Sequence, residues 1–225
     1  MIPRVLEPEV MDTVEEAVDY DSMDHSTVNR QFVSDLLDLV ATGVPSGTNQ
    51  HVLDLGTGTA LIPIELQQRT DTFETVLACD LSTEMLKVAR THLRNSPLED
   101  SILPVFCDAK RLPMADHSCH MVMSNSIVHH IPQPPAVFRE MRRVIGAGGF
   151  LFVRDLMRPG SSERVEDIVQ TYAGDENEHQ QKMFRESLHA ALTVDEVREL
   201  LRQSDFPSDW VQASSDRHWT IAGRI

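Results

Sequence analysis

The sequence predicts an α/β protein with a doubly wound, mainly parallel sheet and helices on both faces. Short apolar segments alternate with segments of helical periodicity between residues 51 and 154, which indicates parallel strands joined by helices. The segments 52–53, 76–79 and 150–153 are near-continuous apolar runs, as expected for strands buried on both faces. The first strand leads into a helix through two closely spaced glycines, Gly56 and Gly58, which let a backbone turn sharply against a ligand.

The expected elements follow one another in a regular order. A helix over residues 32–40 is indicated by apolar residues at helical spacing and ends at the segment 43–45. The alternation then runs as strand 51–55, helix 60–69, strand 75–80, helix 83–94, strand 103–107, strand 119–124, helix 134–145 and strand 150–154. The glycine-rich segment 146–149 is expected to form the turn between the helix 134–145 and the strand 150–154.

The pattern is looser beyond Pro159. We expect a helix around 163–172, a solvated acidic loop at 175–178 and a helix over 194–203. Thr193 and Glu196 form the capping-box pattern that begins this last helix. The segments 210–213 and 218–222 are joined by a polar turn and predict a closing antiparallel pair.

Composition indicates one globular domain and restricts its partners. The chain has 225 residues, of which 41% are hydrophobic and 24% charged, and this length supports a core of its own. The net charge of −15 argues against nucleic acid as a partner, because that affinity depends on Lys and Arg. The charge serves solubility in one interpretation and favours neutral or cationic substrates in another, and we give the first more weight.

Cysteine usage and hydropathy favour a cytoplasmic protein without a membrane partner. Cys79, Cys107 and Cys119 are an odd set beside apolar runs, which is typical of buried free thiols in a reducing compartment. The first residues do not form a signal peptide, and no apolar run reaches membrane-spanning length. The ten histidines are scattered and predict no metal site. The oligomeric state is left open.

Candidate binding residues stand at the ends of successive strands. In an open α/β sheet, ligands bind outside the carboxyl ends of the strands. Asp54 precedes the glycine turn, where a carboxylate would oppose a pyrophosphate but suits a cationic ligand end. Asp80 ends the second strand and could accept both ribose hydroxyls of a nucleoside. The third strand end offers Asp108 and Ala109 to an adenine edge.

Each of these residues also has a structural alternative. Asp80 and Asp108 are common loop-capping residues, and Gly56 and Gly58 alone are a weak signal. The fourth strand end adds Asn125 and the pair His129-His130. Their conjunction, in the right order along the chain, favours binding of a nucleoside that carries positive charge.

The segment 52–153 resembles the class I S-adenosylmethionine-dependent methyltransferases, of the small-molecule kind that includes the menaquinone and ubiquinone methyltransferases. Four motifs carry the resemblance: Val52-Leu-Asp-Leu-Gly-Thr-Gly-Thr, Asp80-Leu-Ser-Thr-Glu-Met-Leu, Asp108-Ala-Lys-Arg-Leu-Pro-Met-Ala-Asp116 and Ser124-Asn-Ser-Ile-Val-His-His-Ile131. It implies a Rossmann-like seven-stranded sheet whose last strand is antiparallel. It also implies four segments of a single domain: a lid and helix at 1–45, a cofactor-binding core at 50–155, a substrate-side insert at 157–192 and closing elements at 193–225.

The resemblance implies S-adenosylmethionine as the cofactor and methyl transfer to a small-molecule acceptor by in-line displacement. The expected cofactor-binding residues are Tyr20, Asp54, Gly56, Thr57, Gly58, Asp80, Leu81, Met85, Asp108, Ala109 and Asn125. Two departures from the family pattern are Ala60, where glycine is usual, and His120, where an acid usually begins the fourth strand.

The candidate catalytic residues are His129, His130 and Asp155. Histidine titrates near neutrality and suits a general base, although the two histidines could simply cap the turn before Pro132. Asp155 directly follows the fifth strand and is expected to face the substrate pocket, or to pair with a neighbouring arginine. Asp24 and His25 are further base candidates from the N-terminal segment.

Other functions fit less well. A nicotinamide dehydrogenase would need a small residue at the last fingerprint position and no acid at Asp54. A nucleic-acid methyltransferase would have a basic face and an Asn-Pro-Pro-aromatic motif, and the sequence has neither. A protein of this fold that binds the cofactor without methylating an acceptor is the remaining alternative.

Overall fold

Seven strands form one mixed sheet in a computed structural model that describes residues 2–10, 12–43 and 51–225. The strands are β1 (His51–Leu55), β2 (Thr75–Asp80), β3 (Ile102–Phe106), β4 (Cys119–Asn125), β5 (Ile145–Leu156), β6 (Val211–Ala213) and β7 (His218–Arg224). Their order in the sheet is β3-β2-β1-β4-β5-β7-β6. The strands β1 to β5 are mutually parallel, whereas β7 is antiparallel to both of its neighbours. The predicted fold class and closing antiparallel pair are therefore confirmed.

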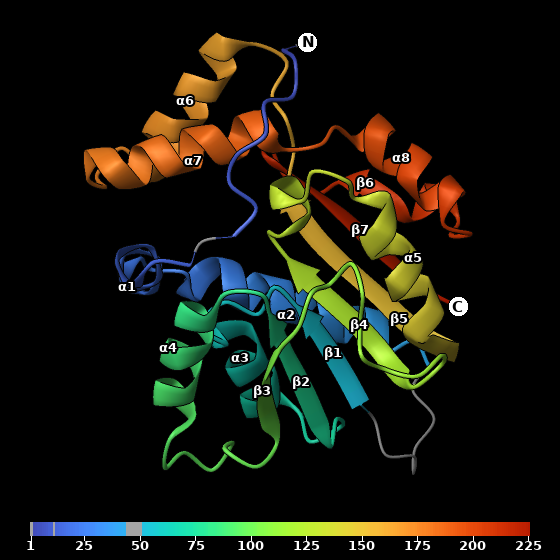
Figure 1. Ribbon diagram of the computed structural model, residues 1–225. Helices are drawn as coiled ribbons and strands as arrows, with labels where there is room; N and C mark the ends of the chain where they lie inside the picture. The colour runs from blue at the N-terminus through green and yellow to red at the C-terminus, as the bar shows by residue number, and fades with distance from the viewer. Residues whose placement is uncertain (1, 11, 44–50) are drawn as a thin grey trace.

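Helices cover both faces of this sheet (Figure 1). They are α1 (Val14–Ser22), α2 (Ser26–Val40), α3 (Leu61–Arg69), α4 (Thr83–Leu93), α5 (Pro135–Val144), α6 (Ser162–Ala173), α7 (Glu178–Ala190) and α8 (Val194–Gln203), with short 3-10 turns η1 (Val128–His130) and η2 (Ser208–Trp210). The segment 44–50, in which we expect the N-terminal part to end, lies outside the described residues.

The core has two layers because successive strand residues point to opposite faces. Val52 packs with Phe32 of α2 and Leu66 of α3 on one face. Leu53 packs with Phe138 of α5 and with residues of α8 on the other. All five of these named side chains are at most 1% exposed. The apolar strand runs of the sequence are thus explained by burial on both faces.

Two helices and one strand boundary differ from the sequence prediction. The helix α1 lies in a segment without clear periodicity, but Thr13 and Glu16 form a capping box that marks its start. The helix α7 begins within the acidic segment that we expected to be a loop, and Asn177 and Gln180 cap it in the same way. The strand β5 already begins at Ile145 and includes the glycine segment, with a register shift against β4.

The helices α6 and α7 form a hairpin beyond the carboxyl end of the sheet, and residues 2–10 run beside it (Figure 1). Val5 donates its backbone N–H to the His189 carbonyl oxygen at 3.0 Å. Met157 and Leu192, which flank the hairpin, form an isolated parallel bridge. Cys79, Cys107 and Cys119 are buried free thiols, as expected. Within the described residues, none of the helices combines the length and apolar character that a membrane span requires.

Candidate functional site

A cavity of about 700 Å³ lies at the carboxyl ends of the parallel strands, the position expected for a ligand in this fold. Its size is within the usual range of small-molecule sites. Most of the predicted cofactor-binding residues line it: Tyr20, Gly56, Gly58, Asp80, Leu81, Met85, Asp108, Ala109 and Asn125. Asp54 and Thr57 line a smaller adjoining pocket instead, together with Tyr20 and Asn29. The folding of the chain thus brings all of these residues to one region.

The glycine turn after β1 is held in place by the end of β2. Gly56 and Gly58 have φ angles of +71° and +57°, a left-handed conformation that favours glycine. Gly56 donates its N–H to the Cys79 carbonyl oxygen at 2.9 Å, and Gly58 donates to Asp80 Oδ2 at 2.8 Å. Ala60 also has a positive φ, of 64°, so the usual family glycine has been replaced at a position where glycine relieves strain.

Asp80 lines the cavity and accepts hydrogen bonds from the backbone around it. Its Oδ1 accepts a hydrogen bond from the Ser82 N–H at 2.8 Å, while Oδ2 accepts from Gly58. Each carboxylate oxygen can accept more than one hydrogen bond, so both oxygens retain acceptor capacity toward the cavity. Burial raises the pKa of Asp80 despite these hydrogen bonds. A pair of ligand hydroxyls would suit this group.

Asp54 lies deeper, beneath the glycine turn. Its side chain is 2% exposed, and burial raises its pKa to about 7. No basic side chain among the described residues forms an ion pair with it. Tyr20, whose own pKa is raised to about 12 by burial and by the nearby Asp80 and Asp54, lines the same small pocket. Such an uncompensated buried acid suits a cationic ligand end.

The cavity wall near Asp108 includes an ion pair between Lys110 and the N-terminal segment. Lys110 forms an ion pair with Asp108 at 2.9 Å and a second with Glu9. Burial and the hydrogen bonds from Lys110 act in opposite directions on Asp108, and its pKa is lowered overall. The carboxylate of Asp108 is therefore ionised and held by Lys110 at the cavity wall.

The structure corrects the expectation that Asp155 faces the substrate pocket. Its side chain is 0% exposed and does not line the cavity. It accepts hydrogen bonds from the Val128 and Leu156 N–H groups, each at 2.6 Å, and its Oδ1 lies 2.5 Å from His129 Nδ1. The neighbouring arginine Arg154 pairs with Asp35 rather than with Asp155. Asp155 therefore acts on the site through the His129 ring and through the backbone of η1.

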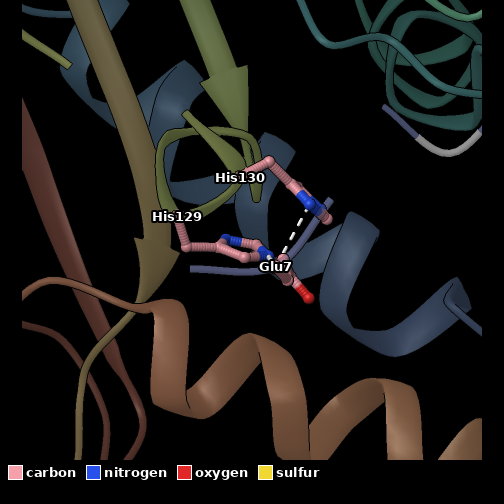
Figure 2. Close-up of side chains that lie close together, drawn as sticks. All are labelled: Glu7, His129 and His130. Carbon is pink, nitrogen blue, oxygen red and sulfur yellow. Dashed lines mark ion pairs between the residues drawn. The ribbon is translucent and has the colours of Figure 1, made fainter. Parts of the chain in front are cut away.

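Both histidines line the cavity, and a residue that the sequence analysis did not identify joins them. Figure 2 shows Glu7 pointing at the His129-His130 pair. Glu7 Oε1 lies 3.2 Å from His130 Nδ1 and 3.5 Å from His129 Nε2, and Glu7 Oε2 accepts a hydrogen bond from Ser187 Oγ at 3.1 Å. No local pattern in residues 2–10 indicates this contact, because it spans more than 120 positions of sequence.

Burial and neighbouring charges shift the pKa values of Glu7, His129 and His130 in different directions. Burial lowers the pKa of His129, but the carboxylates of Asp155 and Glu7 outweigh it and raise the pKa overall. Burial and the neighbouring His129 lower the pKa of His130 to about 3. Burial raises the pKa of Glu7. His130 is therefore neutral, and its Nδ1 faces Glu7 Oε1.

Arg4 anchors the N-terminal segment over the histidine pair. Its Nε donates to the Ala190 carbonyl oxygen at 2.6 Å, and its Nη2 donates to the carbonyl oxygens of His129 and Ile131 at 3.0 and 3.1 Å. One side chain thus ties residues 2–10 both to the end of α7 and to η1.

The far wall of the cavity comes from the N-terminal helices and from the α6–α7 hairpin. Asp24 and His25, the further base candidates, both line the cavity. The His25 ring stacks on Tyr20 with centroids 4.5 Å apart. From the hairpin, Met183 and Phe184 add apolar surface. The other family departure, His120, lies away from the cavity and accepts a hydrogen bond from the His51 N–H at 3.3 Å.

The chain is similar in sequence to known proteins. Residues 53–153 match the Methyltransferase domain family. The chain is 32% identical over 188 residues to a malonyl-[acyl-carrier protein] O-methyltransferase from Marinomonas sp., with 83% of this chain and 67% of that protein covered. It is 31% identical to the ubiquinone/menaquinone biosynthesis C-methyltransferase UbiE of Pectobacterium carotovorum, with 49% of this chain and 44% of that protein covered.

The fold has close counterparts among solved structures. A SAM-dependent methyltransferase from Aquifex aeolicus superposes with a TM-score of 0.65 at 15% identity, and the match covers 95% of this chain and 98% of that one. At that identity, the likeness concerns the fold.

Proposed function

Because the chain belongs to the class I S-adenosylmethionine-dependent methyltransferases, we propose that it methylates a small-molecule acceptor held in the main cavity. S-adenosylmethionine, when bound, would supply a methyl group on a sulfonium sulfur. The acceptor's nucleophile would bond to the methyl carbon in line with the breaking carbon–sulfur bond, and S-adenosylhomocysteine would leave. The observation that supports the proposal is one cavity that brings two chemically different sets of residues together. Nine of the eleven predicted cofactor-binding residues line this cavity, and the His129-His130 pair lines it as well.

We assign the cofactor side residue by residue. Asp80 has acceptor capacity for the ribose hydroxyls, because each of its oxygens receives one backbone hydrogen bond. Asp54 suits the cationic amino-acid end, because it is buried without a basic partner among the described residues. Asp108 and Ala109 lie where the adenine edge would pass. The donor groups present therefore fit the cofactor that the family uses.

The acceptor side is bounded by the histidine pair and the α6–α7 hairpin. In this proposal, His129 and His130 contact the acceptor, and Asp155 is a positioning residue that fixes the ring of His129. Enclosure by Met183 and Phe184 excludes water and orients the reactants, and orientation alone can lower such barriers by about 7–11 kcal/mol. The two relatives are named for O- and C-methylation, so we propose the acceptor only as a small-molecule nucleophile.

Calorimetry on the full chain tests the cofactor assignment. We expect S-adenosylhomocysteine to bind the wild type, to bind Asp80→Ala at least tenfold more weakly, and NADH not to bind. Asp116→Ala, which removes a carboxylate that is 67% exposed, is the matched control and should bind like the wild type. Tight NADH binding, or equal affinity in Asp80→Ala, would contradict the assignment.

Turnover tests the acceptor side. In a screen of hydroxyl, amine, thiol and carbon-acid acceptors, we expect formation of S-adenosylhomocysteine with at least one class. With that acceptor, His130→Ala and Asp155→Asn should lower kcat while cofactor affinity is retained. Unchanged kcat in both variants would show that His130 and the Asp155-His129 contact have no part in the reaction.

A further inference from the structure

Glu7, His129 and His130 bring three metal-binding atoms together beside the cavity, which the two histidines line (Figure 2). The atoms are one carboxylate oxygen and one ring nitrogen of each histidine, and all lie within 4.8 Å of one another. The histidines come from η1 after β4, whereas Glu7 comes from the N-terminal segment that Arg4 holds in place. We call these three residues the Glu-His-His cluster.

Two of these atoms have no hydrogen-bond partner. Glu7 Oε1 and His130 Nδ1 are both buried and unsatisfied, and the Glu7 side chain is 9% exposed. Leaving a buried polar atom unpaired costs about 1–3 kcal/mol. Both atoms point at the same place, 3.2 Å apart. A cation between them would satisfy both.

Two of the three separations within the cluster agree with coordination of one ion, and the third, between the two ring nitrogens, is at most 4.8 Å. Zinc bonds of about 2.0–2.2 Å place neighbouring ligand atoms roughly 3.0–3.6 Å apart for angles between 90° and tetrahedral. The carboxylate oxygen of Glu7 lies 3.2 Å from one ring nitrogen and 3.5 Å from the other. Both separations fall in this range without any movement of Glu7.

Asp155 orients His129 as metal-binding histidines are usually oriented. A ligating histidine typically gives its other ring N–H to a carboxylate, which fixes the tautomer and directs the free lone pair. Here His129 Nδ1 lies 2.5 Å from Asp155 Oδ1, which leaves Nε2 directed at Glu7. Asp155 is itself held by two backbone N–H groups. The supporting contacts of a metal site are therefore in place.

We propose that the Glu-His-His cluster binds one divalent transition-metal ion of the zinc class, with an open coordination position toward the cavity. Two imidazoles favour such an ion over Mg²⁺ or Ca²⁺, which prefer oxygen ligands. Three protein ligands are typical of sites that leave a position for substrate or water. A further step rests on the proposed function: the ion would bind an acceptor oxygen and ease loss of its proton.

Metal titration of the chelator-treated full chain tests the proposal without cofactor or acceptor. We expect one Zn²⁺ per chain by calorimetry, and with Co²⁺ a visible absorption band that Zn²⁺ abolishes. Glu7→Gln and His130→Ala should each weaken binding at least tenfold, and Asp155→Asn about 10–100-fold. Glu9→Gln and His179→Ala are the matched controls, because Glu9 pairs with Lys110 and His179 with Asp19. Both controls should bind Zn²⁺ like the wild type.

The outcomes separate this proposal from the proposed function. Binding of S-adenosylhomocysteine checks that each variant is folded. If Zn²⁺ does not bind the wild type, or binds Glu7→Gln and His130→Ala as tightly, the metal site is wrong even if methyl transfer is found. If Zn²⁺ binds as expected and chelation does not change turnover, the site stands and its role at the acceptor is overturned.

Discussion

At the scale of single residues, Gly56 and Gly58 are not equivalent although they share one turn. A Cβ on Gly56 would lie 1.7 Å from Ile127 Cγ2, whereas a Cβ on Gly58 would lie 3.6 Å from the Tyr20 ring. Both residues have positive φ. Gly56 therefore sets the packing between the turn and the segment before η1, and Gly58 faces the cavity.

This difference predicts unequal costs for the same substitution. Left-handed backbone costs an L-residue about 1–2 kcal/mol, and overpacking adds about 1–3 kcal/mol. We expect Gly58→Ala to lower the free energy of unfolding by the first amount and Gly56→Ala by the sum of both. Urea denaturation of the two variants measures this. Equal losses would show that Ile127 yields to the new methyl group at no cost.

The turn also illustrates what could be predicted from single residues. Asp80, Gly58 and Asn125 can be identified because each lies at or just beyond the carboxyl end of a strand, and strand ends converge in a parallel sheet. The orientation of Asp155 could not be identified in this way. Whether its carboxylate turns toward the cavity or toward His129 depends on the path of η1, which no local pattern specifies.

At the scale of elements, the N-terminal segment 2–10 is held by hydrogen bonds and ion pairs to α7, to η1 and to Lys110. Arg4 makes three hydrogen bonds to backbone carbonyls of α7, η1 and the residue after η1. A planar guanidinium can reach all three, and the single ammonium group of lysine cannot reproduce this geometry. Arg4 therefore contributes three of the hydrogen bonds that hold the segment carrying Glu7 beside the histidines.

We expect Arg4→Ala, and to a lesser extent Arg4→Lys, to release this segment without unfolding the sheet. Hydrogen exchange of the Val5 amide, which donates to His189, should accelerate at least tenfold while amides in β1 and β4 keep their protection. Arg185→Ala, which removes an exposed pair with Glu166, serves as the control. An unchanged Val5 amide in Arg4→Ala would show that other contacts hold the segment.

The elements differ in how well the sequence predicts them. The helices α2, α4 and α5 follow from periodicity, because each buries a regular apolar stripe, and the central strands follow from their apolar runs. The helices α1 and α7 lack a strong stripe, and only their capping boxes mark them. The Glu-His-His cluster joins residues 7 and 129–130 and depends on how the N-terminal segment crosses the sheet edge, which tertiary packing alone determines.

At the scale of the whole molecule, the buried acid Asp54 links stability to pH. Its pKa of about 7 in the folded protein is higher than the ordinary value of about 3.9 in an unfolded chain. Between these two values the folded protein binds more protons, so the free energy of unfolding falls as the pH rises through this window. The slope is at most about 1.4 kcal/mol per pH unit.

We expect Asp54→Asn to remove this contribution. Urea denaturation at pH 5, 6 and 7 should show stability falling more steeply in the wild type than in Asp54→Asn, and Asp116→Asn should follow the wild type. Parallel curves for the wild type and Asp54→Asn would mean that Asp54 is already ionised at pH 5.

The bridge between Met157 and Leu192 has a consequence for how acceptor preference can change. Arg158 also donates its N–H to the Leu192 carbonyl oxygen at 3.1 Å, so the chain leaves for the α6–α7 hairpin and returns at nearly the same point. A segment with adjacent ends can be exchanged for another of different length while the sheet keeps its register. Under the proposed function, exchange of this hairpin for that of a relative is therefore expected to transfer acceptor selectivity and to leave the cofactor-binding residues unchanged.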